Sequence, residues 1–267
     1  MREKIKDKWR DLGPRVVSGL ALAAIGGTAF VLGGLVFLLF ISICAGLMVW
    51  ETSRMAAPEK LNQNKILGVI AGVAVFAAIV LPMSAEGLVF IAVAAAVYFN
   101  ATRDRVWLSL YALLVMVAWG TMWFLREVSF AYSVWLICVV VASDVLGYFA
   151  GRTLGGPKFW PAISPKKTWS GTVAGWIGAA AIGFWFAKGG VDNALALAVT
   201  SVFMALAGQM GDIVESALKR RAGVKDSSNL IPGHGGLLDR FDALMFAAII
   251  MGGFLAAIAP FVSAKGH

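Results

Sequence analysis

The chain has 267 residues, of which 60% are hydrophobic and 14% are charged, and its formal net charge is +8. Its mean hydropathy of +0.81 exceeds what a soluble core needs, which excludes a soluble globular protein and indicates a membrane protein. The two cysteines, Cys44 and Cys138, lie in apolar runs and exclude a disulfide framework or a zinc cluster. The cations lie between the apolar runs, which favours anionic lipids and an anionic substrate over nucleic acid as partners.

The apolar runs predict a series of membrane-spanning helices. Residues 1–13 alternate charged and apolar side chains at helical spacing, which predicts an interfacial amphipathic helix. The run from Val16 to Trp50 is too long for one span, so we expect two helices with a turn near Gly33-Gly34. Further spans are predicted over residues 65–82, 84–99, 107–125, 128–150, 171–187, 191–218 and 241–263. The predicted fold is all-α, a single integral-membrane domain over residues 1–267 with about nine transmembrane helices.

The basic residues predict how this bundle is oriented. If the N-terminus lies in the cytoplasm, only Arg126, Lys188 and Lys265 of the 23 basic residues fall on the outer side. We therefore expect a cytoplasmic N-terminus and an external C-terminus. Segments 143–171 and 211–242 then both face the cytoplasm.

Segment 211–242 concentrates charges and glycines that the rest of the chain avoids. Helical spacing places Asp212, Ser216 and Lys219 on one stripe, and residues 222–236 are expected to form a glycine-rich loop. Asp239 and Asp242 follow, one turn apart on the next helix. Carboxylates are ligands for magnesium, cations bind phosphate oxygens, and glycines let backbone amides approach an anion. The segment therefore predicts a site for a metal ion with a polyphosphate.

Segment 143–171 carries a second charged cluster. Asp144 lies seven residues before Gly151, as Asp212 lies seven residues before Lys219, so each carboxylate is expected about 10 Å below its helix end. A charge within a span is costly and indicates function, although an ion pair or a helix cap is the structural alternative. The Lys-Lys-Thr run at residues 166–168 precedes the next helix, where an anion is favoured, although topology also places lysines there.

A stripe of small residues recurs every four positions on the following helix, at Gly171, Gly175, Ala179 and Gly183. Such stripes let helices pack closely in lipid. We expect packing within one bundle, and the seam of a homodimer is the alternative.

Three motifs resemble those of a known family. Residues 216–242, S-x-L-K-R-x4-K-D-x-S-x2-I-P-x-H-G-G-L-x-D-R-F-D, resemble the signature of phosphatidate cytidylyltransferases, also called CDP-diacylglycerol synthases. Residues 143–156, SDVLGYFAGRTLGG, and residues 164–171, SPKKTWSG, are similar to that family's other motifs, except at Ser170, which is assigned no role. The resemblance implies that CTP and phosphatidate react to give CDP-diacylglycerol and pyrophosphate. It also implies Mg²⁺ as cofactor, with Mn²⁺ and a second ion left open.

Residue roles follow from this resemblance and from the chemistry of the side chains. The predicted metal ligands are Asp212, Asp239 and Asp144, which with Lys219 form the predicted catalytic set. The predicted phosphate-binding residues are Lys167, Lys219, Arg220, Lys225, His234 and Arg240. The predicted supporting residues are Ser164, Ser216, Asp226, Gly235, Gly236 and Asp242. For His234, stabilisation of the turn is the alternative role.

Two other functions remain open on the sequence. A CTP-dependent lipid kinase of the polyprenol type needs the same metal and phosphate groups but releases CDP. An ion-coupled transporter is a more distant alternative, with Asp144, Asp212 and Glu215 as its ion path. Acids near one membrane face, without an inverted repeat, argue against a transporter. The expected location is the bacterial cytoplasmic membrane, with the active site facing the cytoplasm.

Overall fold

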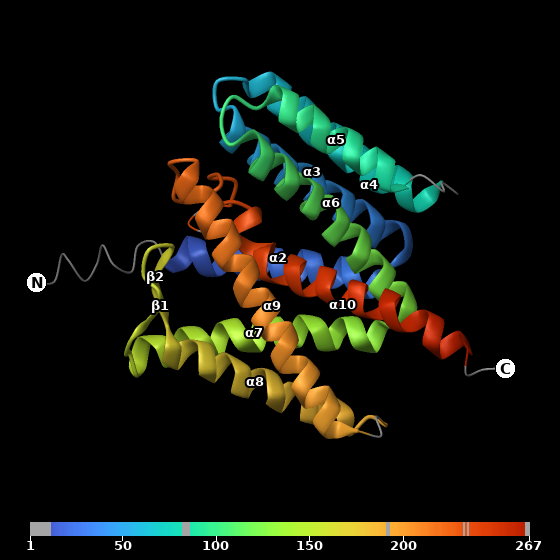
Figure 1. Cartoon of the computed structure of the whole chain (residues 1–267), viewed down its shortest axis with the longest axis vertical. Coiled ribbons are helices and arrows are strands. Elements are labelled where there is room, and N and C mark those ends of the chain that lie inside the picture. Colours follow the sequence, from blue (N-terminus) through green and yellow to red (C-terminus); the bar gives the residue numbers. More distant parts are fainter. Residues whose placement is uncertain (1–11, 82–85, 191–192, 232, 234, 265–267) are drawn as a thin grey trace, which may run out of the picture. The chain divides into compact units, whose positions relative to one another are not determined.

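A computed structural model describes residues 12–81, 86–190, 193–231, 233 and 235–264. The predicted amphipathic helix over residues 1–13 lies almost wholly outside the described residues. His234 is also outside the described residues. Figure 1 shows the course of the helices along the chain.

The described residues form nine helices and one short hairpin. The helices are α2 (Leu12–Leu32), α3 (Gly34–Ala56), α4 (Leu61–Val80), α5 (Glu86–Asn100), α6 (Arg105–Val128), α7 (Phe130–Thr153), α8 (Trp169–Ala187), α9 (Ala194–Arg221) and α10 (Leu238–Ala264). Within the described residues, seven helices, namely α3, α4 and α6 to α10, are long and apolar enough to cross a membrane. The apolar segments Val17–Leu32 and Gly87–Asn100, in α2 and α5, are shorter. The prediction of a polytopic helical membrane protein is therefore confirmed, and the count of nine spans stays a prediction.

The described residues are nearly all helical, as predicted, and one small hairpin is the exception. Strands β1 (Lys158–Trp160) and β2 (Ser164–Thr168) pair in antiparallel fashion, with Lys158 opposite Thr168. Strands this short carry too little alternation to be recognised from sequence. The hairpin leads into α8, where the Thr168 hydroxyl accepts a hydrogen bond from the Gly171 amide at 3.2 Å and caps the helix.

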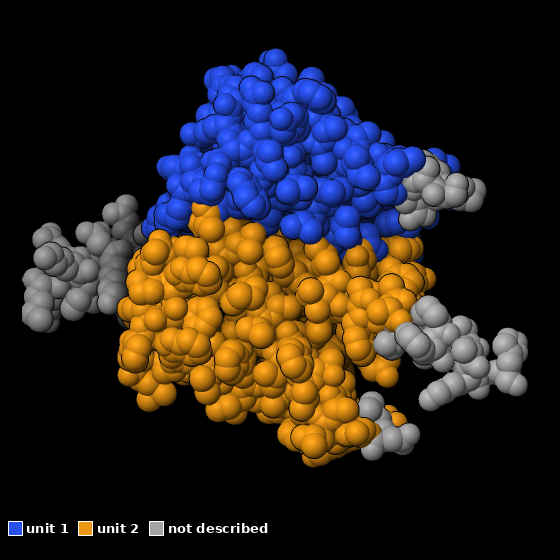
Figure 2. Space-filling model, in the orientation of Figure 1, with its two compact units in different colours: residues 1–120, 218–240 blue, residues 121–217, 241–267 orange. Residues whose placement is uncertain are grey.

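The chain forms two compact units, coloured separately in Figure 2. Unit 1 comprises residues 1–120 and 218–240, and unit 2 comprises residues 121–217 and 241–267. The boundaries between them fall within α6, α9 and α10.

In unit 1, glycines let α3 and α4 approach closely. A Cβ atom at Gly46 would lie 2.8 Å from the Gly68 carbonyl oxygen, and one at Gly72 would lie 2.8 Å from the Ser42 carbonyl oxygen. A Cβ at Gly68 would lie 2.7 Å from both the Gly46 oxygen and the Trp50 Cβ. This is the small-residue packing that membrane helices use in place of a hydrophobic driving force.

We expect Gly68→Ala to destabilise unit 1, because the added methyl meets backbone atoms that cannot rotate away. Overpacking of this kind costs about 1–3 kcal/mol, which thermal unfolding of the protein in detergent would measure. Gly87→Ala is the matched control, since nothing lies within 4 Å of a Cβ at Gly87 on α5. Equal melting temperatures for the two variants would contradict the packing.

In unit 2, the predicted small-residue stripe packs within the chain. A Cβ at Gly171 would lie 2.5 Å from the Gly147 carbonyl oxygen of α7, and one at Gly175 would lie 2.8 Å from the Ser143 hydroxyl. Farther along α8, a Cβ at Gly183 would lie 2.6 Å from the Cα of Ala198 on α9. The expectation of packing within one bundle is confirmed for these contacts, which hold α7 and α9 against α8.

Candidate active site

Three carboxylates of unit 2 form a cluster, called the acid cluster here. It comprises Asp212 and Glu215 of α9 and Asp242 of α10, and one oxygen from each lies within 4.8 Å of the others. Glu215 is 1% exposed and Asp242 is 8% exposed, whereas Asp212 is half-buried. Charges buried in this way are costly unless they pair with cations or coordinate a metal.

Glycines on α9 bring the acid cluster together. A Cβ at Gly211 would lie 2.7 Å from the Asp242 carbonyl oxygen, and one at Gly208 would lie 3.2 Å from the Ala243 carbonyl oxygen. The backbones of α9 and α10 therefore touch beside the two aspartates. Any larger residue at position 211 would push the carboxylates apart.

Lys167 links the acid cluster to strand β2. Its ammonium group forms an ion pair with Asp212 at 2.5 Å and donates to the Gln209 carbonyl oxygen at 3.3 Å. The Gln209 side chain donates to Ser143 of α7 at 3.2 Å and accepts from the Trp176 indole of α8 at 3.1 Å. One glutamine thus ties three helices together behind the Lys167–Asp212 pair.

Asp144 of α7 interacts electrostatically with Asp212 and Lys167, and its side chain is exposed at the surface of unit 2. The structure thus brings together three site residues that the sequence places on different elements. They are Asp144 on α7, Lys167 on β2 and Asp212 on α9.

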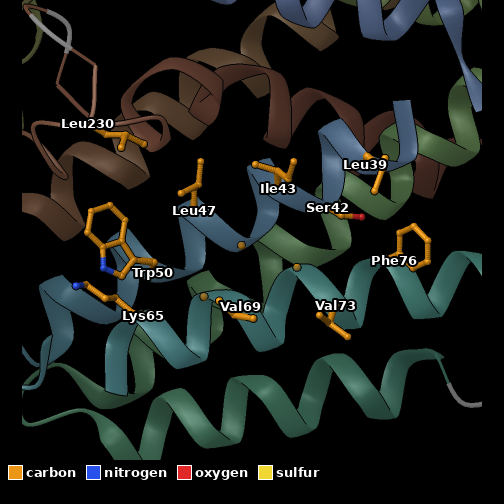
Figure 3. A pocket seen from close by; sticks show the side chains of 13 residues that line it. Leu39, Ser42, Ile43, Leu47, Trp50, Lys65, Val69, Val73, Phe76 and Leu230 are labelled. Carbon is orange, nitrogen blue, oxygen red and sulfur yellow. The ribbon is translucent and has the colours of Figure 1, made fainter. Parts of the chain in front are cut away.

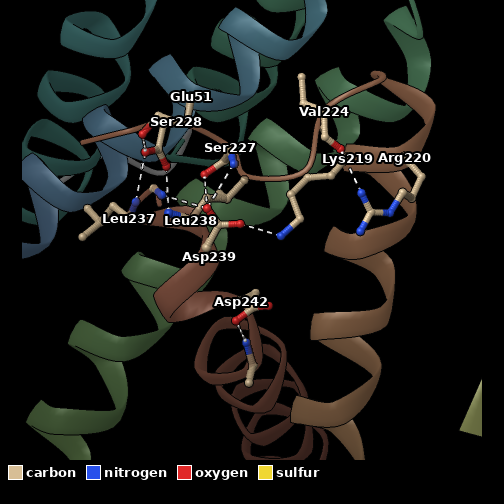
Figure 4. A network of polar contacts seen from close by, with 12 residues as sticks. Glu51, Lys219, Arg220, Val224, Ser227, Ser228, Leu237, Leu238, Asp239 and Asp242 are labelled. Carbon is tan, nitrogen blue, oxygen red and sulfur yellow. Dashed lines mark hydrogen bonds and ion pairs between the residues drawn. The ribbon is translucent and has the colours of Figure 1, made fainter. Parts of the chain in front are cut away.

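Unit 1 contains a second polar network, shown in Figure 4. Lys219 at the end of α9 forms an ion pair with Asp239 Oδ1 at 2.5 Å. The other oxygen, Asp239 Oδ2, accepts hydrogen bonds from the Ser227 amide at 3.0 Å, the Ser227 hydroxyl at 2.9 Å and the Gly236 amide at 2.8 Å. One carboxylate therefore closes the loop 222–237 onto the first turn of α10, through bonds that its charge strengthens.

Glu51 of α3 fastens the same loop from the opposite side (Figure 4). It is 0% exposed, and its carboxylate accepts from the Ser228 hydroxyl at 2.5 Å, the Leu237 amide at 2.9 Å and the Leu238 amide at 2.7 Å. An anion at a helix N-terminus satisfies amides that lack intrahelical partners. Glu51 is thus the N-terminal cap of α10.

The two glycines before α10 make these contacts sterically possible. Gly235 has φ of 85°, and a Cβ there would lie 2.8 Å from Asp239 Oδ2. A Cβ at Gly236 would collide with the Ser227 hydroxyl and with Glu51. The predicted supporting roles of both glycines therefore have a physical basis in the approach of two carboxylates to the backbone.

A cavity of about 340 Å³ opens beside the loop 222–237 in unit 1. Arg54 of α3, Arg103 of the α5–α6 connection and Lys225 of the loop all line it. The Arg103 side chain donates to the Met55 carbonyl oxygen at 2.9 Å, which holds the guanidinium at the end of α3. Three cations from three elements around one cavity suit a polyanion.

The remaining predicted residues lie outside these two networks or at their edges. Arg220 donates to the Val224 carbonyl oxygen at 3.4 Å, Asp226 lines the 340 Å³ cavity, and Ser164 begins β2 opposite Trp160. Ser216 is half-buried on α9, and Arg240 is exposed on α10.

Sequence reasoning missed the parts played by four residues. In the sequence, Arg54 and Arg103 serve only to predict the membrane topology. Glu215 is predicted only as part of an ion path, and no role is predicted for Glu51. Glu215 carries a charge within a predicted span, the same signal that drew attention to Asp144, and Glu51 directly follows the apolar run that ends at Trp50.

The acid cluster fits a divalent cation. It offers hard carboxylate oxygens from three side chains, two of them buried, and these are the ligands that Mg²⁺ and Mn²⁺ take in proteins. Asp212 belongs both to this cluster and to the predicted ligand set. Asp144 and Asp239 as metal ligands stay predictions.

The fold and the site define a polytopic helical membrane protein with buried carboxylates and lysines suited to a metal ion and an anionic substrate. Residues 13–258 match the family described as "Cytidylyltransferase family". A protein named phosphatidate cytidylyltransferase from Brucella abortus biovar 1 (strain 9-941) is 32% identical over 253 residues, or 90% of this chain and 92% of the relative.

Two further relatives with the same name match shorter regions of the chain. The Rickettsia bellii (strain RML369-C) protein is 40% identical over 129 residues, 44% of this chain and 56% of the relative. The Bacillus subtilis (strain 168) protein is 42% identical over 125 residues, 46% of each chain. The chain belongs to the cytidylyltransferase family.

Proposed function

We propose that this protein transfers the cytidylyl group of CTP to phosphatidate, giving CDP-diacylglycerol and pyrophosphate for phospholipid synthesis. Family membership names the reaction class, and the relatives' names supply the lipid substrate. The observation that carries the proposal is the acid cluster of Asp212, Glu215 and Asp242, paired with Lys167 in a membrane-embedded chain.

In this reaction a phosphate oxygen of phosphatidate attacks the α-phosphorus of CTP. The bond from that phosphorus to the oxygen bridging to the β-phosphorus breaks, and pyrophosphate leaves with the electron pair. The attacking phosphate is already anionic, so no strong general base is needed. The barrier lies in bringing two polyanions together, and fixed cations lower it.

Asp212, Glu215 and Asp242 are the residues that would hold Mg²⁺. A bound Mg²⁺ supplies Lewis-acid stabilisation of charge on the phosphate oxygens. Lys167, paired with Asp212, holds that carboxylate in a fixed orientation. Asp144 is proposed to interact with the Asp212 and Lys167 charges at this site. Asp239 stays a proposed metal ligand, and binding of a second ion is left open.

Lys219, Arg220 and Arg240 are proposed phosphate contacts, and so is His234. Lys219 holds Asp239 in place through an ion pair whose partners are 11% and 7% exposed in their side chains. Its ammonium group is therefore fixed before substrate arrives, which removes an entropic cost from the reaction. Ser164, Ser216 and Asp226 are proposed to support the site.

The 340 Å³ cavity is proposed to receive the nucleotide's triphosphate, because Arg54, Arg103 and Lys225 line it. We expect Lys225→Ala to raise the KM for CTP about tenfold, as loss of one charge-assisted contact costs roughly 1.5–3 kcal/mol at most. Steady-state kinetics with CTP as the varied substrate would measure this. Lys188→Ala, at the end of α8, is the matched control, and an unchanged KM in Lys225→Ala would remove that residue from the site.

Activity is expected to depend on a divalent cation. Treatment with EDTA should abolish turnover, because the carboxylates alone repel the substrate phosphates, and excess Mg²⁺ or Mn²⁺ should restore it. Full rates in the chelator would contradict the role given to the acid cluster.

The nine-span topology, with a cytoplasmic N-terminus, belongs to the same proposal. It makes α2 and α5 transmembrane, and it places the segments 143–171 and 211–242 where CTP is available. The cationic inner loops would then bind anionic lipids of the bacterial cytoplasmic membrane. A homodimer is compatible with this arrangement.

The test uses purified protein, phosphatidate and CTP labelled at either the α- or the γ-phosphorus. Transfer of the α-label into lipid, with release of pyrophosphate, is the expected result. Transfer of the γ-label with release of CDP would identify a lipid kinase instead. Ion flux in liposomes without nucleotide, and no labelled lipid, would identify a transporter.

A further inference from the structure

An apolar groove of about 710 Å³ runs along α3 and α4 in unit 1 (Figure 3). Ile43 of α3 and Val69 and Val73 of α4 line it, and they are 61%, 68% and 62% exposed. Leu230, from the loop 222–237, closes one end (Figure 3). A volume of this size is ordinary for a ligand site, although its lining is far more apolar than most.

The floor of the groove lacks side chains. Gly46, Gly68 and Gly72 belong to the lining and are the residues at which α3 and α4 touch through their backbones. Side chains from both helices therefore rise on either side of a bare floor. The shape suits a long, thin, flexible apolar molecule better than a second helix, which needs about 8–10 Å between axes.

The two ends of the groove differ chemically. Among the described residues that line it, Lys65 alone is charged, and it lies with Trp50 at the end that Leu230 closes (Figure 3). Phe76 lies at the far end. Lysine and tryptophan mark the headgroup level of a membrane protein.

The length of the groove matches one leaflet. From Lys65 to Phe76, α4 rises about 16 Å at ~1.5 Å per residue, half of a hydrocarbon core of about 30 Å. A groove of this length, with a cation at one end and apolar side chains along the rest, is complementary to an anionic phospholipid of one leaflet.

We propose that this groove binds one acyl chain of the lipid substrate, with the phosphate end of the lipid at Lys65; this rests on the proposed function. The loop 222–237 connects the groove to the site, because Leu230 lies two residues after Ser228, which donates to Glu51. Glu51 follows Trp50 directly on α3. A chain seated in the groove thus rests against the loop whose other contacts involve Asp239 and Lys219.

The test blocks the groove with a large side chain far from Lys65. Val73 lies about 12 Å beyond Lys65 along α4, so a tryptophan there blocks a long acyl chain but not a short one. Val73→Trp should raise the KM for dioleoyl phosphatidate about tenfold while leaving the KM for dihexanoyl phosphatidate and for CTP unchanged. Ile66→Trp is the control, because Ile66 is 58% exposed on α4 but does not line the groove.

Equal loss with both lipids would overturn the proposal, because it would mean that the groove holds a structural lipid or a second copy of the chain. No change with either lipid would overturn it as well. A photoreactive long-chain phosphatidate gives an answer independent of turnover: it should label α3 and α4 in the native protein and not in Val73→Trp. If the native protein is labelled there but makes no CDP-diacylglycerol, the result would contradict the proposed function alone.

Discussion

Asp212→Asn should abolish cytidylyl transfer while leaving the protein folded. The substitution removes one of three carboxylates from the acid cluster and breaks the ion pair with Lys167. Loss of a group that holds charge in the transition state costs about 10²–10³-fold in kcat, and loss of a metal ligand should cost at least as much. Because the Asp212 side chain is 35% exposed, the melting temperature should change little.

The matched control for Asp212→Asn is Glu127→Gln in the same unit. Glu127 also makes an ion pair, with Arg126 at 3.1 Å, but its side chain is 52% exposed. The turnover rate of Glu127→Gln should equal that of the native protein. A near-normal rate for purified Asp212→Asn would contradict the assignment of Asp212.

Asp239→Asn is expected to damage both stability and turnover. The carboxylate holds Lys219, Ser227 and Gly236 at once, and its side chain is only 7% exposed. Removing one partner of a buried ion pair costs roughly 3–5 kcal/mol, because the other charge stays buried. We expect the loop 222–237 to open, with faster proteolysis there and a kcat lower by about 10²-fold or more.

An exposed ion pair in the same unit provides the control. Asp104 pairs with Arg221 at 2.5 Å, but the arginine side chain is 54% exposed. Asp104→Asn should change the unfolding free energy by about 0–1 kcal/mol. If both substitutions have equally small effects, the loop does not depend on Asp239.

The sequence predicted most helix boundaries because the signals were local. The turn near Gly33-Gly34 is present, and both glycines have positive φ, at 65° and 48°. Helix α9 ends at Arg221, where the apolar pattern stops, and Gly223 follows with φ of 73°. The span predicted over residues 171–187 corresponds to α8, Trp169–Ala187.

The site was harder to predict, since its partners meet only through tertiary packing. Helical spacing placed Lys219 on the stripe of Asp212, yet its ion pair is with Asp239, across the loop. Glu215 completes the acid cluster through Asp242 of another helix. Glu51 lies more than 180 positions before the α10 amides that it caps, so no local pattern could connect them.

The acid cluster is the proposed binding place of the divalent ion, on which the proposed reaction depends. Mn²⁺ binding, followed by electron paramagnetic resonance without any turnover, tests this directly in the native protein and in Asp212→Asn and Glu215→Gln. The native protein should bind Mn²⁺, and each substitution should weaken that binding by about tenfold or more. Equal Mn²⁺ affinity in all three proteins would show that the acid cluster does not bind the ion.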